Sequence, residues 1–553
     1  MITTAPTPQA GSSGGGGAPS KGGAAGQAGS TPSGSAHFLA VGLSRAATTD
    51  LAGRLKVDLD AEAEITAVFT DQAGHTVKVA SKAPSKGHEL RFFGLRAGRT
   101  YTAKIHAKTG DGGGADATPM LYTTQPLPAD FPPIEVAVAD PARPGYTMFP
   151  VSRFVKGGVD QGWGYLVAVD GAGEVVWYAF TGRDLSDVRR TKAGLVRVIA
   201  GTDGFGDLDL LDGPKSGVLA VGLDPQATLV PGVVGAMVDT LHHDAIELPS
   251  GNALALGTER RTIHQTDCPK TYDKDYDVVG DVIVEIEPST GKIVSKISLF
   301  DMLDPCRRVD TAFKSQFWAS TYGKDSADWT HANSVFYDEK TDTVLVSLRH
   351  QDWVIAYHKG SDGKDVGKLL WRLGPEGDFA FVGDGALPPY HQHAAKLLPN
   401  GHLALYDNGT TRPGTDDLTL SKLPVSRAVE LALDTSGGPG SFTAKEVFVF
   451  GPHDERAKDP ATGASIPWYA SVVGDFDLTA EGTALVTHGC VTDPANTFVF
   501  DDDARRFARV VEVTHDAAQK IVLDLRVRDP KPAGFQSYLV FRAERHATLD
   551  WAP

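Results

Sequence analysis

The sequence predicts an all-β protein in which a six-bladed β-propeller follows a small β-sandwich. Two observations indicate this fold class. Glycine (61 residues) and proline (34 residues) are abundant, as is typical of chains with many turns and short strands. Strand-turn-strand segments recur from residue 134 onward, as in GYLVAVDGAGEVVWYAF (164–180), whereas helical periodicity is confined to short pieces.

Length and composition exclude several classes of protein. The 553 residues exceed one ordinary domain of about 100–200 residues. Hydrophobic residues make up 41% and charged residues 22%, so the chain can bury a large core and is not globally disordered. The net charge of −16 argues against a nucleic-acid or anionic-membrane partner, because both require a basic surface. No apolar run approaches the length of a transmembrane helix.

Residues 1–36 form a low-complexity segment of Gly, Ser, Ala, Pro, Thr and Gln with little else. Such a composition cannot bury enough apolar surface to offset the entropy of ordering, so we expect a disordered, flexible tether. No apolar signal-peptide region follows Met1. We therefore expect either that the start of the chain is missing or that the protein is not exported by that route.

Residues 37–128 predict a separate small β domain. Alternating stretches occur at LKVDL, EITAVFT, HTVKVA, ELRFFGL and TYTAKIHA, with turn residues between them. The segment LRAGRTY (95–101) matches the sandwich pattern in which a Tyr at a strand start hydrogen-bonds back to the preceding corner. The domain thus resembles a fibronectin type III or immunoglobulin-like module. The Pro-rich segment PLPADFPP (126–133) closes it.

Residues 134–553 predict the propeller. Hairpins such as DVIVEIEPSTGKIVSKISLF (281–300) recur along this span with turn signals between strands. The span accommodates six blades of about 40–70 residues each including insertions, and seven or eight blades remain the alternatives.

The three cysteines exclude a disulfide-dense scaffold and a CxxC metal site, and they permit at most one disulfide. Three unpaired thiols are the default expectation. The alternative is a bridge between Cys268 and Cys306, because these two residues flank one insertion-like stretch.

An internal repeat places histidines at equivalent positions. HDAIELPSGNALAL, starting at His243, aligns without gaps to HAAKLLPNGHLALY, starting at His393. A third copy starts at His331 and has a longer turn. In each copy a His opens a strand, and equivalent positions of different blades lie at the same radius and height. If these are the inner strands, the three imidazoles point into one central funnel.

The turn of the third copy adds an arginine to this group. Pairing outward from a turn centred on Lys340 matches Tyr337 with Thr343, and therefore His331 with Arg349. Directly opposed residues of a hairpin have Cβ atoms about 4.5–5.5 Å apart. We therefore expect Arg349 beside His331 on the same face.

Pairing outward from the turn near Asn400, in the copy that starts at His393, places Asp407 opposite His393. A carboxylate there would fix the tautomer of the imidazole. His242 and His391 are adjacent to the repeat positions, so a regular strand would direct them to the opposite face. We expect these two residues to have supporting or structural roles.

Three His and one Arg favour one of two kinds of site. His243, His331 and His393 with Asp244 could ligate a metal such as zinc. However, Arg349 would add a permanent positive charge beside the cation. A guanidinium in a His cluster instead suits a tetrahedral oxyanion such as sulfate or phosphate, with one neutral His as nucleophile and another as general acid/base.

At these residues the sequence resembles the bacterial aryl-sulfate sulfotransferases. The matching segments are HHD (242–244), DWTHANS (328–334), SLRHQ (347–351), and QHAA (392–395) followed by LLPNG and DNG (407–409). The resemblance covers about residues 134–550. It implies a six-bladed propeller behind a small β-sandwich. It also implies transfer of sulfate from a phenolic ester to another phenol, through a sulfohistidine and without a nucleotide sulfate donor.

The resemblance also implies roles for individual residues. His393 would be the nucleophile that becomes sulfated. His331 and Arg349 would bind the sulfuryl oxygens, and His243 would be the general acid/base, since the gapless alignment favours it over its neighbour. Asn333 would hydrogen-bond the sulfate or orient a neighbour.

The implied partners are small phenolic sulfate donors and phenol acceptors, with no cofactor, no metal and no nucleic acid. The implied location is the cell envelope or periplasm, and a homodimer is left open. The alternative functions are a non-catalytic binding propeller and a metal-dependent hydrolase that uses the same His cluster. The aromatic residues that either line the site or belong to blade cores are Phe317, Trp318, Tyr322, Trp329, Trp353 and Tyr390.

Overall fold

The fold is taken from a computed structural model of the chain. The described residues are 36–155, 158–200, 204–215, 238, 240–308, 317–416, 422–438, 440–458, 463, 465–492, 505–531 and 534–551. The predicted tether lies outside the described residues apart from Ala36. No described helix is long and apolar enough to cross a membrane.

The small domain is one seven-stranded sheet that curls around its own core. The long strand β2 pairs with β1 and β4 along its first half, and with β3 and β5 along its second half, so it belongs to both faces. The N–H of Arg96 donates to the hydroxyl of Tyr101 at 2.8 Å, which is the predicted corner contact. The strands are β1 (Phe38–Arg45), β2 (Gly53–Asp71), β3 (Thr76–Ala80), β4 (Ser85–Phe92), β5 (Thr100–Lys108), β6 (Gly114–Asp116) and β7 (Met120–Thr123).

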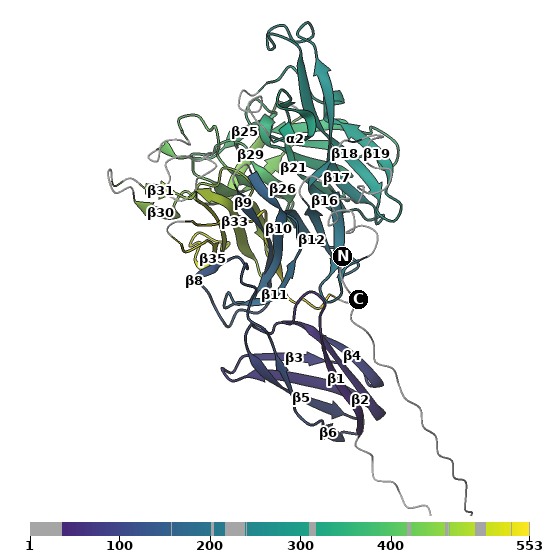
Figure 1. Ribbon diagram of the computed structural model, residues 1–553. Coiled ribbons are helices and arrows are strands. Elements are labelled where there is room, and N and C mark those ends of the chain that lie inside the picture. The colour runs from purple at the N-terminus through teal and green to yellow at the C-terminus, as the bar shows by residue number, and fades with distance from the viewer. Residues whose placement is uncertain are drawn as a thin grey trace, which may run out of the picture.

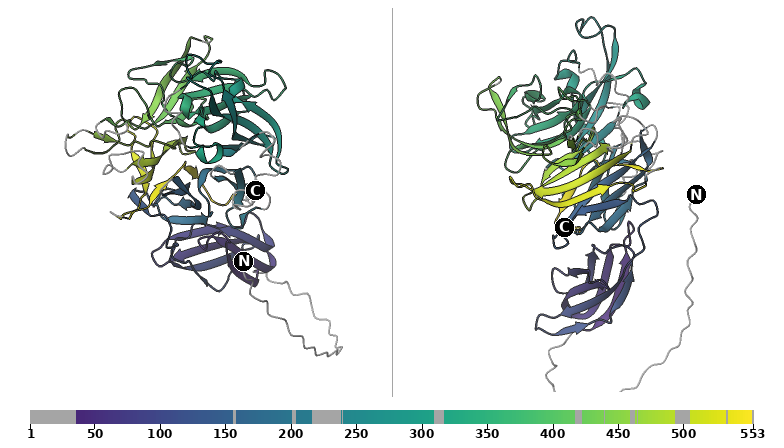
Figure 2. Two further views of the ribbon diagram at one scale, coloured as in Figure 1. Left: turned by 45° about the horizontal axis from the view of Figure 1, so that its top comes forward. Right: turned by 90° about the vertical axis from the view of Figure 1, so that its left-hand side faces the viewer.

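Six further sheets of at least four strands follow in the described part of the chain, arranged around a common centre (Figure 2). They confirm the predicted six-bladed propeller. Blade 1 contains β9 (Tyr146–Val155), β10 (Gly158–Val169) and β11 (Val175–Phe180). Blade 2 contains β12 (Leu185–Arg190), β13 (Val196–Ala200), β14 (Gly204–Asp209) and β15 (Gly213–Pro214). Blade 3 contains β16 (Leu241–Glu247), β17 (Ala253–Ile263), β18 (Tyr276–Glu287) and β19 (Lys292–Ser298), with β20 (Ala327–Asp328) beside β18.

Blades 4 to 6 complete the ring. Blade 4 contains β21 (Ala332–Asp338), β22 (Thr343–Leu348), β23 (Trp353–His358) and β24 (Lys368–Leu373). Blade 5 contains β26 (His393–Leu397), β27 (Leu403–Asp407), β28 (Arg427–Asp434) and β29 (Phe442–Phe450), with β25 (Phe379–Val382) beside β29. Blade 6 contains β32 (Asp475–Leu478), β33 (Thr483–Thr492), β34 (Arg506–Thr514) and β35 (Ile521–Val527). Short elements between strands are η1 (Leu299–Asp301), α2 (Ala319–Tyr322), η3 (Arg349–Gln351), β30 (Glu455–Lys458) and β31 (Ser465–Pro467).

Strands from both ends of the propeller close the ring. The C-terminal strands β36 (Ser537–Leu539) and β37 (Glu544–His546) both pair with β9 and form the innermost position of blade 1. Strand β8 (Ile134–Val138) pairs with β35 and forms the outer edge of blade 6. The first and last blades are therefore each completed by a strand from the other end of the domain, which leaves no open seam in the ring.

The small domain packs on blades 1 and 2, below them in Figure 1. Leu51 and Phe93 belong to the apolar clusters of these blades, and the N–H of Ala47 donates to the carbonyl of Leu211 at 2.7 Å. Arg96 adds an ion pair with Asp170 at 2.6 Å.

A disulfide joins Cys268, beyond the end of β17, to Cys306, which follows η1. The default expectation of three unpaired thiols is wrong, and the alternative pairing is the one found. The two residues are 38 positions apart, but the long β17–β18 hairpin returns the chain so that their Cα atoms lie 5.3 Å apart. Cys490 is buried as a free thiol.

Candidate active site

The structure brings together the three repeat histidines, which come from the innermost strands of blades 3, 4 and 5 or immediately precede them. The ring centroid of His243 lies 5.0 Å from that of His331 and 6.4 Å from that of His393. The relative exposure of the three residues is 9% or less. The predicted convergence of imidazoles near the propeller axis is therefore present in the geometry.

Local backbone geometry turns these side chains toward one another. His243 and His331 have positive φ angles of 60° and 48°, and Ala394 next to His393 has a φ of 57°. Each of these residues lies at or beside a β-bulge at the start of its inner strand. Left-handed conformations are unfavourable for residues other than glycine, and such strain concentrates where a fold imposes a side-chain direction.

Arg349 lies beside His331, although the predicted turn is wrong. The hairpin pairs Asp338 with Thr343, so the turn is not centred on Lys340. A β-bulge at the start of β21 shifts the register back by one residue, and the N–H of Arg349 donates to the carbonyl of His331 at 3.1 Å.

Asp407 does not face His393, so the predicted carboxylate partner is wrong. A bulge in β26 pairs His393 with Tyr406 instead. The carboxylate of Asp407 accepts from Arg427 at 2.7 Å, and Nδ1 of His393 hydrogen-bonds the carbonyl of Gly474 at 2.9 Å. A backbone carbonyl takes the place that the sequence assigns to a carboxylate.

The Gly474 contact determines where the proton of His393 lies. A carbonyl can only accept, so Nδ1 carries the proton and Nε2 keeps its lone pair. No described group hydrogen-bonds this Nε2. Burial lowers the pKa of the His393 ring to about 3, and the positive charge of Arg542 contributes. His393 is therefore a neutral imidazole with a free, unprotonated nitrogen.

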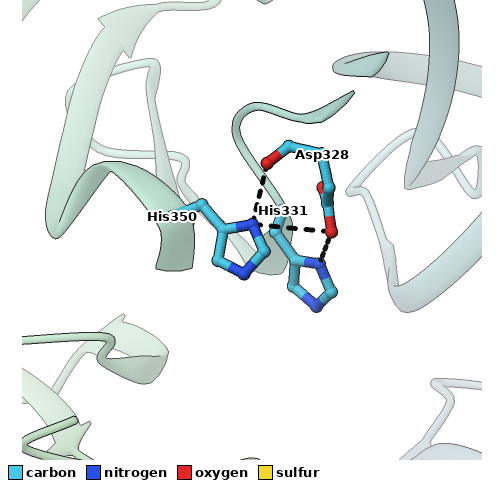
Figure 3. A group of neighbouring side chains, drawn as sticks. All are labelled: Asp328, His331 and His350. Carbon is cyan, nitrogen blue, oxygen red and sulfur yellow. Dashed lines mark hydrogen bonds and ion pairs between the residues drawn. The ribbon is translucent and has the colours of Figure 1, made fainter. Parts of the chain in front are cut away.

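His331 is held by Asp328, which also holds a second ring (Figure 3). Nδ1 of His331 donates to Oδ2 of Asp328 at 2.6 Å, and Nδ1 of His350 donates to the backbone carbonyl of Asp328 at 2.9 Å. The other nitrogen of each ring points away from the carboxylate. These three residues lie as close together as metal ligands do, but here the Nδ1 atoms are already engaged with Asp328 itself. Burial lowers the pKa of His331, so this ring also favours its neutral form.

Arg349 and Asn333 complete the predicted set. Arg349 is buried and donates through Nη2 to the carbonyl of Ser471 at 2.9 Å. Asn333 donates to the carbonyl of Gln392 at 2.8 Å and accepts from the N–H of Ala394 at 3.3 Å. The NH₂ group and the carbonyl oxygen of the Asn333 amide thus hold the backbone on either side of His393, so this side chain orients His393.

The two adjacent histidines, His242 and His243, differ in their surroundings. The His243 ring faces His331 and His393. The His242 ring lies behind it, fully buried, with an edge contact to Trp318 at 5.0 Å. Burial and the neighbouring rings hold the pKa of His243 well below its usual range.

Two residues near His393 were missed by sequence reasoning because they lie in the C-terminal closing segment, outside the repeat. The Phe541 ring lies 4.8 Å from His393 and 5.7 Å from His243. Arg542 is buried, and its Nε lies 2.6 Å from Oδ1 of Asp187.

The metal-ligand set considered from the sequence does not assemble. Both carboxylate oxygens of Asp244 accept from Arg189 at 3.0 Å, and one also accepts from the N–H of Val335. Asp244 therefore belongs to an ion-pair network and not to the imidazole cluster.

One of the aromatic residues singled out from the sequence contacts two of the three imidazoles. Phe317 lies 4.8 Å from the ring of His331 and 5.5 Å from that of His243. Trp329 instead stacks on Phe300 at 4.9 Å. Together Phe317 and Phe541 give the site two apolar walls.

The six-bladed ring and its central cluster of imidazoles and guanidinium define a propeller of the arylsulfotransferase type. A model of the arylsulfotransferase (ASST) family matches residues 154–533, and the chain belongs to this family.

Two curated relatives are similar to this chain. Arylsulfate sulfotransferase AssT of Escherichia coli O6:H1 strain CFT073 is 24% identical over 345 residues, which cover 54% of this chain and 52% of the relative. The enzyme of the same name from Lelliottia amnigena is 25% identical over 244 residues, covering 35% of this chain and 38% of the relative. The chain thus matches about half the length of these relatives or less.

Solved structures with partial likeness include two other proteins. A periplasmic gluconolactonase, PpgL, of Pseudomonas aeruginosa has a TM-score of 0.31 at 12% identity, covering 89% of this chain and 100% of that one. A luciferin-regenerating enzyme has a TM-score of 0.33 at 9% identity, covering 74% and 99%.

The position of Gly474 predicts a steric effect on the site. Its φ is +120°, and an added Cβ would lie 2.4 Å from the Tyr406 ring. We expect Gly474→Ala to destabilise the protein by about 3 kcal/mol, through strain and overpacking together. Gly482→Ala is the matched control, because Gly482 also has a positive φ of +77° but faces open space, and should cost about 1 kcal/mol. Denaturant unfolding measures both, and equal losses would contradict the steric argument.

The depressed pKa of His393 predicts acid sensitivity. Its folded pKa of about 3 lies below the ordinary 6.5, so its stabilising contribution is complete above pH 6.5 and is lost as the pH falls toward 3. Between pH 7 and pH 4.5 the wild type should lose about 2–3 kcal/mol more unfolding free energy than His393→Gln. Parallel pH dependences of the two proteins would show that the ring is not buried as a neutral group.

Proposed function

We propose that this protein is an aryl-sulfate sulfotransferase. It moves a sulfuryl group from a phenolic sulfate ester to an acceptor phenol through a sulfated His393, without a nucleotide sulfate donor. The observation that carries the proposal is the unprotonated Nε2 of His393, which is free of hydrogen bonds from the described residues beside two further imidazoles and a guanidinium. Membership of the arylsulfotransferase family supports the same chemistry.

In the first half-reaction the lone pair of Nε2 attacks the sulfur, and the bond from sulfur to the phenolic oxygen breaks. The phenoxide leaves with the bonding electrons. His393 retains its Nδ1 proton, so the sulfated ring is a zwitterion with positive charge on the imidazole. The Gly474 carbonyl accepts this N–H at 2.9 Å and stabilises that charge. A positively charged ring is a good leaving group, so the second half-reaction can pass the sulfuryl group to an acceptor.

Arg349 binds the sulfuryl oxygens. His331 donates to one of them from Nε2 only while its ring is protonated, because its Nδ1 already donates to Asp328. The guanidinium is buried, so water screens its charge little, and preorganised charge aimed at developing negative charge is a large catalytic contribution. Asp328 fixes Nδ1 of His331 as the protonated nitrogen facing the carboxylate. The positive charge of Arg542 lowers the pKa of His393 and so helps to keep this ring neutral.

His243 is the general acid and base. A phenol has a pKa of about 10, so phenoxide release benefits from a proton, and the acceptor phenol must lose one. The His243 ring lies between His331 and Phe541, within reach of the oxygen that leaves or attacks. Phe317 and Phe541 form apolar walls that favour aromatic substrates over free inorganic sulfate.

We place the protein in the cell envelope or periplasm, with small phenolic sulfates and phenols as its substrates. The Cys268–Cys306 disulfide supports this location, because structural disulfides persist in oxidising compartments.

The proposal is tested with a chromogenic aryl sulfate, such as 4-nitrophenyl sulfate, and an acceptor phenol with no added cofactor. We expect a stoichiometric burst of phenol without acceptor, and an acid-labile adduct of about 80 Da, one SO₃, on His393. His393→Ala should abolish both signals. His402→Ala, which changes a partly exposed histidine of the β26–β27 turn, is the control and should leave them unchanged. Burst and adduct in His393→Ala, or turnover lost to a chelator alone, would exclude this mechanism.

Replacement of the guanidinium tests the sulfuryl site separately. Arg349→Lys keeps the charge but loses the planar fork, and we expect kcat to fall by about 10²–10³ with a smaller change in KM. Steady-state kinetics with 4-nitrophenyl sulfate measure this. If Arg349→Lys raises KM but leaves kcat unchanged, Arg349 stabilises the bound substrate and the transition state equally.

A further inference from the structure

A second imidazole lies directly behind His243. Nδ1 of His242 hydrogen-bonds Nδ1 of His243 at 2.7 Å. Two ring nitrogens at this distance share one proton, so one donates and the other accepts. Nε2 of His242 lies 3.0 Å from Oδ1 of Asp281, which is an ion-pair distance, although the two atoms are not aligned for a hydrogen bond in this structure. The three side chains therefore form a line from the site to a buried carboxylate.

Asp281 is oriented for this contact. Its Oδ2 accepts from the hydroxyl of Thr330 and from the N–H of Ala332. These donors fix the carboxylate so that Oδ1 faces His242, and the carboxylate is almost fully buried. The charge of this carboxylate therefore lies directly beside the His242 ring.

His242 and Asp281 are both shielded from bulk water. His242 is buried, and the Trp318 ring packs on it. The titratable groups that face His243 are His331, with Asp328 from β20 behind it, and His393 from β26. Those rings surround His243 with groups that disfavour a positive charge on it.

We propose, on the basis of the proposed function, that His242 and Asp281 form with His243 a buried relay that stores the proton exchanged between the two half-reactions. His242 is thus a positioning and proton-storing residue, and His243 is the group that touches the substrate oxygen.

The relay balances in each direction. Before phenoxide leaves, the relay holds the stored proton. In this state His242 is an imidazolium that faces Asp281 with its Nε2–H and donates from Nδ1 to His243, and the proton of His243 itself is on Nε2. When phenoxide leaves, it takes the Nε2 proton of His243, and the Nδ1 proton of His242 moves to Nδ1 of His243. After this transfer both rings are neutral, and Nδ1 of His243 donates to Nδ1 of His242.

The acceptor phenol runs the relay backward. Its hydroxyl gives a proton to Nε2 of His243 as its oxygen attacks the sulfated ring, and the Nδ1 proton of His243 returns to His242. His243 is never doubly protonated, so the charge rests beside Asp281. This agrees with the strongly lowered pKa of His243.

Leaving-group dependence distinguishes a relay from a structural role. A nitrophenol leaves readily without a proton, whereas an unsubstituted phenol needs one. We expect His242→Gln and Asp281→Asn to slow the single-turnover release of 4-nitrophenol less than tenfold, but that of phenol from phenyl sulfate by about 10²–10³.

The matched control is His402→Gln, which removes another histidine paired with a carboxylate, Glu430, at 2.6 Å. It should leave both substrates unaffected. If the wild type releases no 4-nitrophenol, the proposed function itself fails. If the wild type turns over but folded His242→Gln and Asp281→Asn slow both esters by one common factor, the pair is structural and the relay is wrong.

Discussion

The hydrogen bond from Nδ1 of His393 to the Gly474 carbonyl is the contact on which the site depends. Burial alone would leave the imidazole neutral but would not say which nitrogen holds the proton. A carbonyl acceptor decides this, because it cannot donate. The predicted carboxylate would have stabilised a protonated ring and made it a poor nucleophile. A neutral acceptor orients the ring without charging it, and Gly474 can provide it only because no side chain fills the space before Tyr406.

A ring of buried charges lies around these neutral imidazoles. Arg542 and Arg189 pair with Asp187 and Asp244, and Lys396 pairs with Asp475 at 2.8 Å. Removing one partner of such a network leaves an uncompensated buried charge, so the network constrains the geometry strongly even where its net contribution to stability is small. Because its members lie on the inner strands of several blades or adjacent to them, it fixes the positions of the strands that carry the histidines.

Periodicity in the sequence was sufficient to predict the propeller and the convergence of His243, His331 and His393, because repeats in a propeller occupy equivalent places. It was insufficient to predict which residues face each other within a hairpin. A β-bulge changes the register by one residue and leaves no clear mark in the sequence, which is why Asp407 was assigned to His393 although it contacts Arg427. A bulge also explains why His331 lies beside Arg349 despite the wrong turn centre. The disulfide depended on a hairpin geometry that composition does not contain.

Phe541 was missed for a topological reason that also connects the fold to the site. The segment between β36 and β37 completes blade 1, and its backbone contacts blade 6: the N–H of Val540 donates to Gly489, and the N–H of Gly474 donates to the carbonyl of Phe541. The carbonyl of the same Gly474 holds His393. The segment between these two strands therefore supplies an aromatic wall, a guanidinium and a contact to the residue that orients His393. Closure of the ring and completion of the site therefore depend on the same segment, because blade 5 carries His393 whereas the C-terminal segment helps to hold the residue that sets the tautomer of His393.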